Sequence, residues 1–187
     1  MPEPETSLVD KVRRLHWAFA DAQIDHAFGG ALALAYYTRE PRATADIDLN
    51  ISLGPDHVEL AFDALPSAVQ WVPSELAQAR SNEQVRLWWG RTPIDLFFRA
   101  SPFHDAVAAR AELHPFGDEL LPFLSAGDLC VFKALFDRPK DWIDIAAMAD
   151  AGLLDVGLAV SELRALIGDD QRVRRLSALE ASPGEAG

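Results

Sequence analysis

Two aspartates separated by one residue lie in an apolar segment of the chain. Asp46 and Asp48 alternate with Ile47, Leu49 and Ile51, and a strand places alternate side chains on opposite faces. The two carboxylates would share one face while the apolar side chains enter a core. Carboxylates this close repel each other, and the usual compensation is a divalent cation such as Mg²⁺, which completes its octahedron with substrate phosphates. The alternative is an exposed strand face at a sheet edge.

A glycine pair precedes this acidic strand. Gly29 and Gly30 follow a short predicted strand at 24–28 and precede an apolar helical segment at 31–37. Glycine backbone can approach a phosphate closely, and the N-terminus of the following helix offers unpaired N–H groups and a favourable dipole. A glycine pair alone is more often just a turn. Next to the acidic strand, it indicates a phosphate-binding turn.

A third carboxylate, Asp95, lies in a later apolar segment. The segments 83–89 and 93–99 predict two strands joined by a connection short enough for a hairpin. Asp95 faces away from its two apolar neighbours, although a single polar residue facing out of a strand is an ordinary feature. A phosphate-binding turn with three carboxylates on neighbouring strands indicates a site for Mg²⁺-assisted attack on a nucleoside triphosphate.

The remaining pattern predicts helices around a mixed sheet. Apolar spacing, N-caps and prolines set the expected helix bounds. Residues 114–124 are expected to be irregular. The expected helices cover residues 6–22, 56–65, 102–113, 125–137, 139–150 and 156–167.

Three short motifs, GG, RATADIDL and PIDLF, resemble the nucleotidyltransferase superfamily. The downstream segment FKALFDRPKDWIDI is similar to the AbiEii/MenT group of nucleotidyltransferase toxins, and together the motifs cover about residues 28–145. Gly30 stands where many relatives have serine. The resemblance implies an α+β fold: a nucleotidyltransferase-like mixed β-sheet flanked by helices over residues 1–120, with a C-terminal helical region over 121–187 packed on it as a single compact unit.

The resemblance also assigns roles to the acids. Asp46, Asp48 and Asp95 would bind two Mg²⁺ ions, for which Mn²⁺ is an alternative, and Asp95 would share the ion nearest the acceptor hydroxyl. Two ions held in this way stabilise the attacking and the leaving oxygens of an in-line displacement, and pyrophosphate leaves.

Further polar residues are candidates for contact with the nucleotide. Lys133 lies among apolar neighbours, where a cation needs an anion such as a triphosphate or must reach solvent as a surface lysine. By resemblance Lys140 and Asp141 belong to the site, although Asp141 is equally suited to a first-turn helix-dipole role. Arg42 and Thr44 are candidates to orient the acidic strand or contact the nucleotide, and packing explains them as simply.

Two adjacent tryptophans offer a platform for a base. On a strand, Trp88 and Trp89 point to opposite faces, so at most one of them can stack on a base while the other joins the core. Ordinary burial is the alternative. The histidines and the single cysteine, Cys130, show no metal-ligand spacing, which argues against zinc.

Composition limits the partners of the protein. The chain has 187 residues, 49% of them hydrophobic, and a formal net charge of −12. This charge opposes diffuse attraction to nucleic acid or anionic membrane, so any polynucleotide must be gripped locally. We expect a cytoplasmic protein without a membrane partner, because no leader and no stretch of about 20 apolar residues is visible.

The resemblance implies transfer of a nucleoside monophosphate from an NTP to an RNA 3′ end, the tRNA acceptor end above all. The protein would then be the toxin of a toxin–antitoxin pair with a cognate antitoxin as partner. Three alternatives remain open: transfer to a protein hydroxyl (AMPylation), a catalytically silent binding module, and transfer to a small molecule such as an antibiotic.

Overall fold

The computed structural model describes residues 6–41 and 43–180, which divide into two compact units. The first unit contains residues 6–32 and 43–124, and the second contains residues 33–41 and 125–180. The packing of both into a single compact unit stays a prediction.

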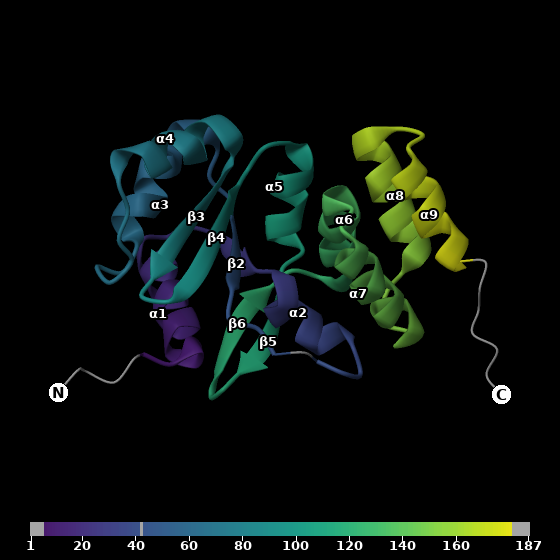
Figure 1. Ribbon diagram of the computed structural model, residues 1–187, viewed down its shortest axis with the longest axis horizontal. Helices are drawn as coiled ribbons and strands as arrows, with labels where there is room; N and C mark the ends of the chain where they lie inside the picture. Colours follow the sequence, from purple (N-terminus) through teal and green to yellow (C-terminus); the bar gives the residue numbers. More distant parts are fainter. Residues whose placement is uncertain (1–5, 42, 181–187) are drawn as a thin grey trace. The chain divides into compact units, whose positions relative to one another are not determined.

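The first unit is built on a mixed sheet, which confirms the predicted α+β fold class. Within the described residues the sheet has six strands in the order β3-β4-β2-β1-β6-β5. Figure 1 labels these strands except β1. The pairs β2·β4 and β1·β6 are parallel and the other neighbours are antiparallel. The strands are β1 (His26–Phe28), β2 (Ile47–Ile51), β3 (Gln84–Trp89), β4 (Thr92–Phe98), β5 (Glu112–Phe116) and β6 (Glu119–Phe123).

The first unit contains helices in addition to the sheet. Within the described residues, the second unit is entirely helical and contains no strand. The first unit has α1 (Leu8–Asp21), a 3-10 turn η1 (Pro55–His57), α3 (Val58–Ala64), α4 (Pro73–Asn82) and α5 (Pro102–Ala109). The short helix α2 (Gly30–Tyr37) begins in the first unit and continues into the second. The second unit has α6 (Ala126–Phe136), α7 (Pro139–Asp150), α8 (Val156–Ile167) and α9 (Gln171–Glu180).

Apolar periodicity fixes the elements that frame the acids. In β2 and β3, buried and less buried residues alternate strictly, as expected for strands with one face in the core.

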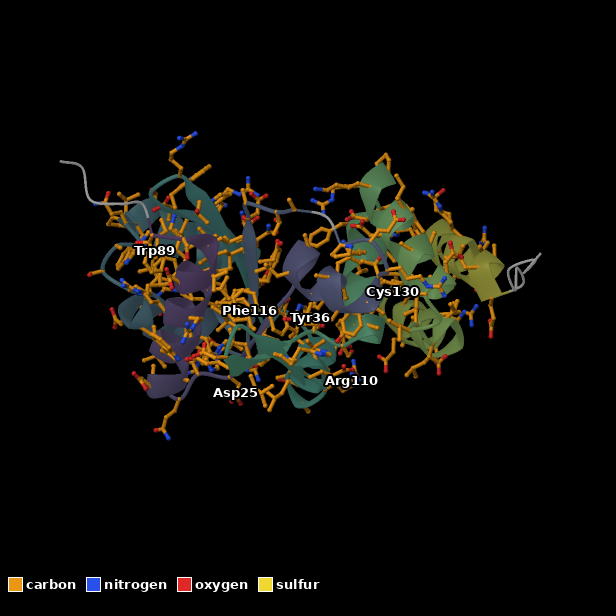
Figure 2. The ribbon with its side chains drawn as sticks, turned by 90° about the horizontal axis from the view of Figure 1, so that it is seen from below. Asp25, Tyr36, Trp89, Arg110, Phe116 and Cys130 are labelled. Carbon is orange, nitrogen blue, oxygen red and sulfur yellow. The ribbon has the colours of Figure 1, made fainter. Side chains whose placement is uncertain are left out.

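Helix α1 is capped by the Ser7 hydroxyl, which accepts a hydrogen bond from the Asp10 N–H at 3.1 Å. At the end of β3, the buried Trp89 (labelled in Figure 2) accepts a hydrogen bond at its carbonyl from Lys11 Nζ of α1, at 3.1 Å.

The region expected to be irregular, 114–124, instead contains most of a β-hairpin. Strands β5 and β6 pair in register across a turn at Gly117, whose φ is +67°. Pro115 and Pro122 lie inside these strands. Because proline cannot donate a ladder hydrogen bond, the two prolines argue against strands when the sequence is considered alone. The hairpin tolerates both prolines: β5 is an edge strand, and β6 meets β1 only at Phe123.

Two further helices, α4 and α9, lie where the sequence pattern predicts no helix. In α4 only Ala79 is buried, so there is almost no apolar period to detect. The first half of α9 resembles a solvated basic segment, yet it buries Val173 and Leu176. Strand β2 begins at Ile47, which places Asp46 just before the strand rather than inside it.

Helix caps and burial in the second unit agree with the sequence. The Ser125 hydroxyl caps α6 by accepting from the Asp128 N–H at 3.2 Å, and Pro139 begins α7. Cys130 (labelled in Figure 2) is fully buried in α6, and burial raises the pKa of its thiol to about 12. A thiol in that state is no nucleophile. None of the described helices has the length and apolarity that a membrane crossing requires.

Candidate active site

Three polar side chains form one row across neighbouring strands of the first unit. Asp48 of β2 and Asp95 of β4 are register partners in the parallel pair, and Arg86 of β3 is the register partner of Asp95 in the hairpin. Side chains of register partners point to the same face of a sheet. We call Arg86, Asp95 and Asp48 the polar row.

Within the polar row, Arg86 binds Asp95 through both ends of its guanidinium group. Arg86 Nε donates to Asp95 Oδ1 at 2.8 Å, and Nη2 donates to Oδ2 at 2.6 Å. The Asp95 side chain is 9% exposed and that of Arg86 is 50% exposed. The hydrogen bonds to Asp95, with the nearby charges of Asp46 and Asp48, raise the pKa of Arg86 further above its already high value.

Asp46 lies at the entrance to β2 and is exposed. The Thr44 hydroxyl accepts a hydrogen bond from the Asp46 N–H at 3.2 Å and donates to the Asp46 carbonyl oxygen at 3.3 Å. Thr44 therefore orders the backbone that leads into the acidic strand, one of the two roles that the sequence suggests for it. Arg42 lies outside the described residues.

The glycine turn lies directly against Asp48. The Gly29 N–H donates to the Asp48 carbonyl oxygen at 2.9 Å. Gly30 begins α2 with φ of +54°, and a Cβ added there would overlap the Asp48 carboxylate. A serine at this position would meet both obstacles, so the geometry favours glycine here.

The carboxylates of Asp46, Asp48 and Asp95 have the donor atoms that a divalent cation needs, but their side chains are not arranged around a common point as a metal site requires. Carboxylate oxygens are the ligands that Mg²⁺ prefers. Within residues 6–41 and 43–180, however, no three side chains of the His, Cys, Asp and Glu types are already gathered as a metal cluster. Both oxygens of Asp95 are bound by Arg86, so an ion that uses Asp95 must compete with this arginine.

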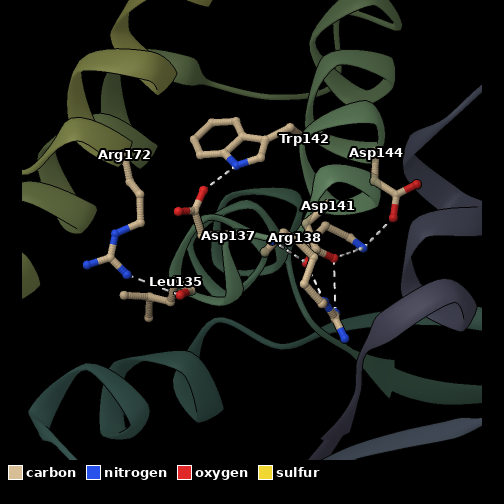
Figure 3. A network of polar contacts seen from close by, with 8 residues as sticks. Leu135, Asp137, Arg138, Asp141, Trp142, Asp144 and Arg172 are labelled. Atoms are coloured by element: carbon tan, nitrogen blue, oxygen red, sulfur yellow. Dashed lines mark hydrogen bonds and ion pairs between the residues drawn. The ribbon is translucent and has the colours of Figure 1, made fainter.

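The second unit contains its own charged network (Figure 3). Buried Lys133 donates from Nζ to Asp144 Oδ2 at 2.6 Å, and its Nζ lies 3.8 Å from Asp141 Oδ1. Arg138 donates to Asp141 from Nε at 2.6 Å and from Nη2 at 3.0 Å. Two cations thus face two carboxylates, and Lys133 is not the surface lysine that the sequence left open.

The predicted site residues of the second unit divide by exposure. Lys140 is exposed near the start of α7, whereas Asp141 is completely buried. The Asp141 carboxylate also accepts from the Arg138 N–H at 3.3 Å, which is the first-turn role considered for it. Asp144, the nearer of the two carboxylates to Lys133, is not among the site residues that the sequence predicts. Beside this network, Trp142 Nε1 donates to Asp137 at 2.6 Å, and Arg175 stacks on the Trp142 ring at 4.2 Å.

The structure brings Gly29, Gly30, Asp46, Asp48 and Asp95 together within the first unit. Arg86 is the residue that sequence reasoning missed there. Its signal is the hairpin turn, but the expected strands 83–89 and 93–99 leave a three-residue connection, which would place Leu87 opposite Asp95. The two-residue turn of the structure places Arg86 there.

Comparison with known proteins gives a result at the level of fold. Neither the family models nor the curated proteins contain a match to this chain. Among solved structures, the antibiotic-resistance factor ANT(2'')-Ia in solution aligns with a TM-score of 0.55 and 15% identity, covering 96% of this chain and 94% of that one.

Two further solved structures extend this likeness. A nucleotidyltransferase-like protein from Paracoccidioides brasiliensis aligns with a TM-score of 0.53 and 18% identity over 91% of this chain and 92% of its own. The lincosamide antibiotic adenylyltransferase LnuA aligns with a TM-score of 0.52 and 12% identity over 79% of this chain and 99% of its own. This chain therefore has the fold of the nucleotidyltransferases.

Proposed function

We propose that this protein is an NTP-dependent nucleotidyltransferase that transfers a nucleoside monophosphate to an acceptor hydroxyl. The observation that carries the proposal is the close placement of Gly30 against the Asp48 carboxylate, with Asp95 in register on the next strand. This arrangement lies on a nucleotidyltransferase fold. It combines a glycine turn at a helix N-terminus, which suits a phosphate, with carboxylates that suit a divalent cation.

The chain's own residues divide the chemical work. In the transfer, the acceptor hydroxyl loses its proton to solvent and its oxygen bonds to the α-phosphorus. The bond between the α-phosphorus and the oxygen that bridges to the β-phosphate breaks, and pyrophosphate leaves. Gly29 and Gly30 would approach the triphosphate through their backbone at the N-terminus of α2. Asp46, Asp48 and Asp95 would hold Mg²⁺ or Mn²⁺, and Asp95 would face the acceptor hydroxyl. Bound Mg²⁺ neutralises charge on the attacking and leaving oxygens. The nucleotide-site roles that the resemblance implies for Lys140 and Asp141, and those expected for Lys133, Arg42 and Thr44, stay predictions.

For the acceptor we propose an RNA 3′ end, in particular the tRNA acceptor end, with the protein acting as a toxin that a cognate antitoxin neutralises. The support is the likeness of the segment FKALFDRPKDWIDI to AbiEii/MenT toxins. A second candidate acceptor is a small hydroxylated molecule. Two observations favour it: the fold neighbours include an antibiotic-resistance factor and a lincosamide adenylyltransferase, and the net charge of −12 opposes a polyanion.

A labelling assay tests the reaction and identifies the acceptor. Purified protein is incubated with Mg²⁺ and each of four α-³²P-labelled NTPs, in parallel with total tRNA and with a set of hydroxylated small molecules that includes aminoglycosides and lincosamides. We expect label on one of these acceptors and release of pyrophosphate. Asp48→Asn should reduce transfer by at least about 100-fold, whereas Asp63→Asn, an exposed acid on α3, should leave it unchanged. Label on the protein itself would point to protein hydroxyls, and no label from any NTP would overturn the proposal.

A further inference from the structure

A hollow of about 670 Å³ lies at the β3 edge of the sheet in the first unit. This volume is in the range of small-ligand sites. We call it the aromatic hollow, and its walls include Leu65, Val69, Trp71, Val72, Glu75 and Trp88.

Trp88 is the exposed member of the tryptophan pair noted in the sequence. Trp88 is 48% exposed and Trp89 is 5% exposed, so the alternation of β3 places Trp89 in the core and leaves Trp88 available for stacking. The opposite wall is held in place. Trp71 packs edge-on against Phe62 with ring centroids 5.0 Å apart, and Glu75 accepts a hydrogen bond from the Val72 N–H at 2.8 Å.

The aromatic hollow lies next to the polar row. Trp88 and Arg86 are two residues apart on β3, so their side chains lie on the same face of the sheet. Trp88 pairs with Pro93, the next residue Ile94 pairs with Ile47 of β2, and Asp46 directly precedes Ile47. Two strand spacings, about 10 Å, therefore separate the backbone at Trp88 from the backbone at Asp46.

Strand order assigns the two sides of the polar row to different substrates. The glycine turn follows β1, beyond β2, whereas Trp88 lies on β3, beyond β4. A triphosphate at Gly29 and Gly30 thus leaves the β3 side for the acceptor. On the basis of the function proposed above, we propose that the aromatic hollow binds a planar aromatic ring of the acceptor, whose hydroxyl group reaches the acids.

The walls define the chemistry of this ring. Tryptophan faces stack on planar rings of any sequence or substituent pattern, which suits a nucleobase as well as the ring of a small molecule. Glu75 is the only charged residue among the wall residues, so the hollow favours a neutral or cationic ring over an anionic one. The terminal nucleoside of an RNA and an aromatic small molecule with a hydroxyl group share this chemistry.

Tryptophan fluorescence tests the site without any reaction. The probes are adenosine, which represents a terminal nucleoside, and phenyl β-D-glucoside, which represents a small aromatic acceptor. We expect saturable quenching by at least one probe, and a dissociation constant about 10-fold higher in Trp88→Leu. Trp17→Leu removes a tryptophan of similar exposure from α1, outside the hollow, and should bind like the wild type. Circular dichroism checks that both variants fold.

The outcomes separate the hollow from the reaction. Binding of adenosine alone identifies a nucleoside acceptor, and binding of the glucoside alone identifies a small molecule. Once an acceptor is labelled, Trp88→Leu should raise the KM for that acceptor about 10-fold and leave the KM for NTP unchanged. An unchanged acceptor KM, or no saturable quenching by either probe, overturns the inference while transfer stands. Trp88-dependent binding of a probe by a protein that transfers no nucleotide overturns the proposed function instead.

Discussion

Arg86 binds both carboxylate oxygens of Asp95 from the neighbouring strand, at 2.8 and 2.6 Å. This pair places a permanent positive charge beside Asp46 and Asp48, whose charges also act on the arginine. The arginine thus neutralises part of an otherwise acidic face. It also occupies the third carboxylate that a pair of metal ions would use.

Removing this arginine should therefore tighten the binding of a divalent cation. A unit charge about 5 Å from a dication repels it by roughly 2 kcal/mol even in water, so Arg86→Gln should bind Mn²⁺ about 10-fold more tightly or better, as measured by titration calorimetry. Arg91→Gln removes the same charge at the hairpin turn, away from the acids, and serves as the control.

A double-mutant cycle shows whether the competition is direct. In an Asp95→Asn background, residue 95 has no carboxylate for which Arg86 and Mn²⁺ could compete. Arg86→Gln should therefore have a much smaller effect on Mn²⁺ affinity in this background. An effect of equal size in both backgrounds would mean that Arg86 acts only through long-range charge. Weaker Mn²⁺ binding by the single variant would show instead that Arg86 helps to build the metal site.

The glycine turn is expected to be a stability determinant as well as part of the site. Gly30→Ala introduces a side chain at φ of +54° and against the Asp48 carboxylate, so we expect a loss of about 1 to 3 kcal/mol in the free energy of unfolding. Urea denaturation measures it. Gly127→Ala is the control, because this helical glycine has nothing within 4 Å of an added Cβ and should be neutral or slightly stabilising. A neutral Gly30→Ala would contradict the overlap at Asp48.

Sequence reasoning reaches the acids because strand periodicity is a local property. The alternation around Asp48 predicts its exposed face, and β2 shows that alternation. The hairpin turn fixes the register of β3 and β4, but the expected strands 83–89 and 93–99 leave three residues between them, one more than the observed turn, so only the existence of the β3·β4 pairing was available from the sequence. The register of Asp48 with Asp95 was not, because parallel strands are joined by a long crossover that does not encode register.

Other features depend on contacts that no local pattern reveals. Lys133 and Asp144 lie 11 residues apart on successive helices, and only the packing of α6 with α7 brings them to 2.6 Å. The prolines at 115 and 122 suppress the strand signal of β5 and β6, and the position of the hairpin in the sheet makes them tolerable. In both cases tertiary structure overrides the local sequence signal.

The buried lysine of the second unit should be needed for stability. Lys133→Met would leave the Asp141 and Asp144 carboxylates buried with one cation fewer, and breaking a buried pair in this way costs about 3 to 5 kcal/mol. Urea denaturation should show this loss, while Lys140→Met, at an exposed position of α7, should change little. The double variant with Asp144→Leu should recover part of the loss. Additive losses would argue against a direct pairing of Lys133 with Asp144.

The stability of the first unit should depend on pH through two histidines. His26 Nδ1 lies 2.8 Å from the Ile24 carbonyl oxygen and therefore carries a proton, so its Nε2 accepts from His16 Nδ1 at 3.0 Å. Burial lowers the pKa of both His16 and His26. Protonation of both rings would set two N–H groups against each other.

Because the folded pKa values lie below the unfolded value of about 6.5, the unfolded chain takes up protons first as the pH falls. The free energy of unfolding should therefore be highest above pH 7 and decline as the pH falls below about 6.5. Urea denaturation between pH 5.5 and 7.5 measures the slope. His26→Gln should reduce it, whereas His57→Gln, at an exposed position in η1, should preserve it. If the slope survives His26→Gln intact, then other groups, such as the partly buried His104, control this pH dependence.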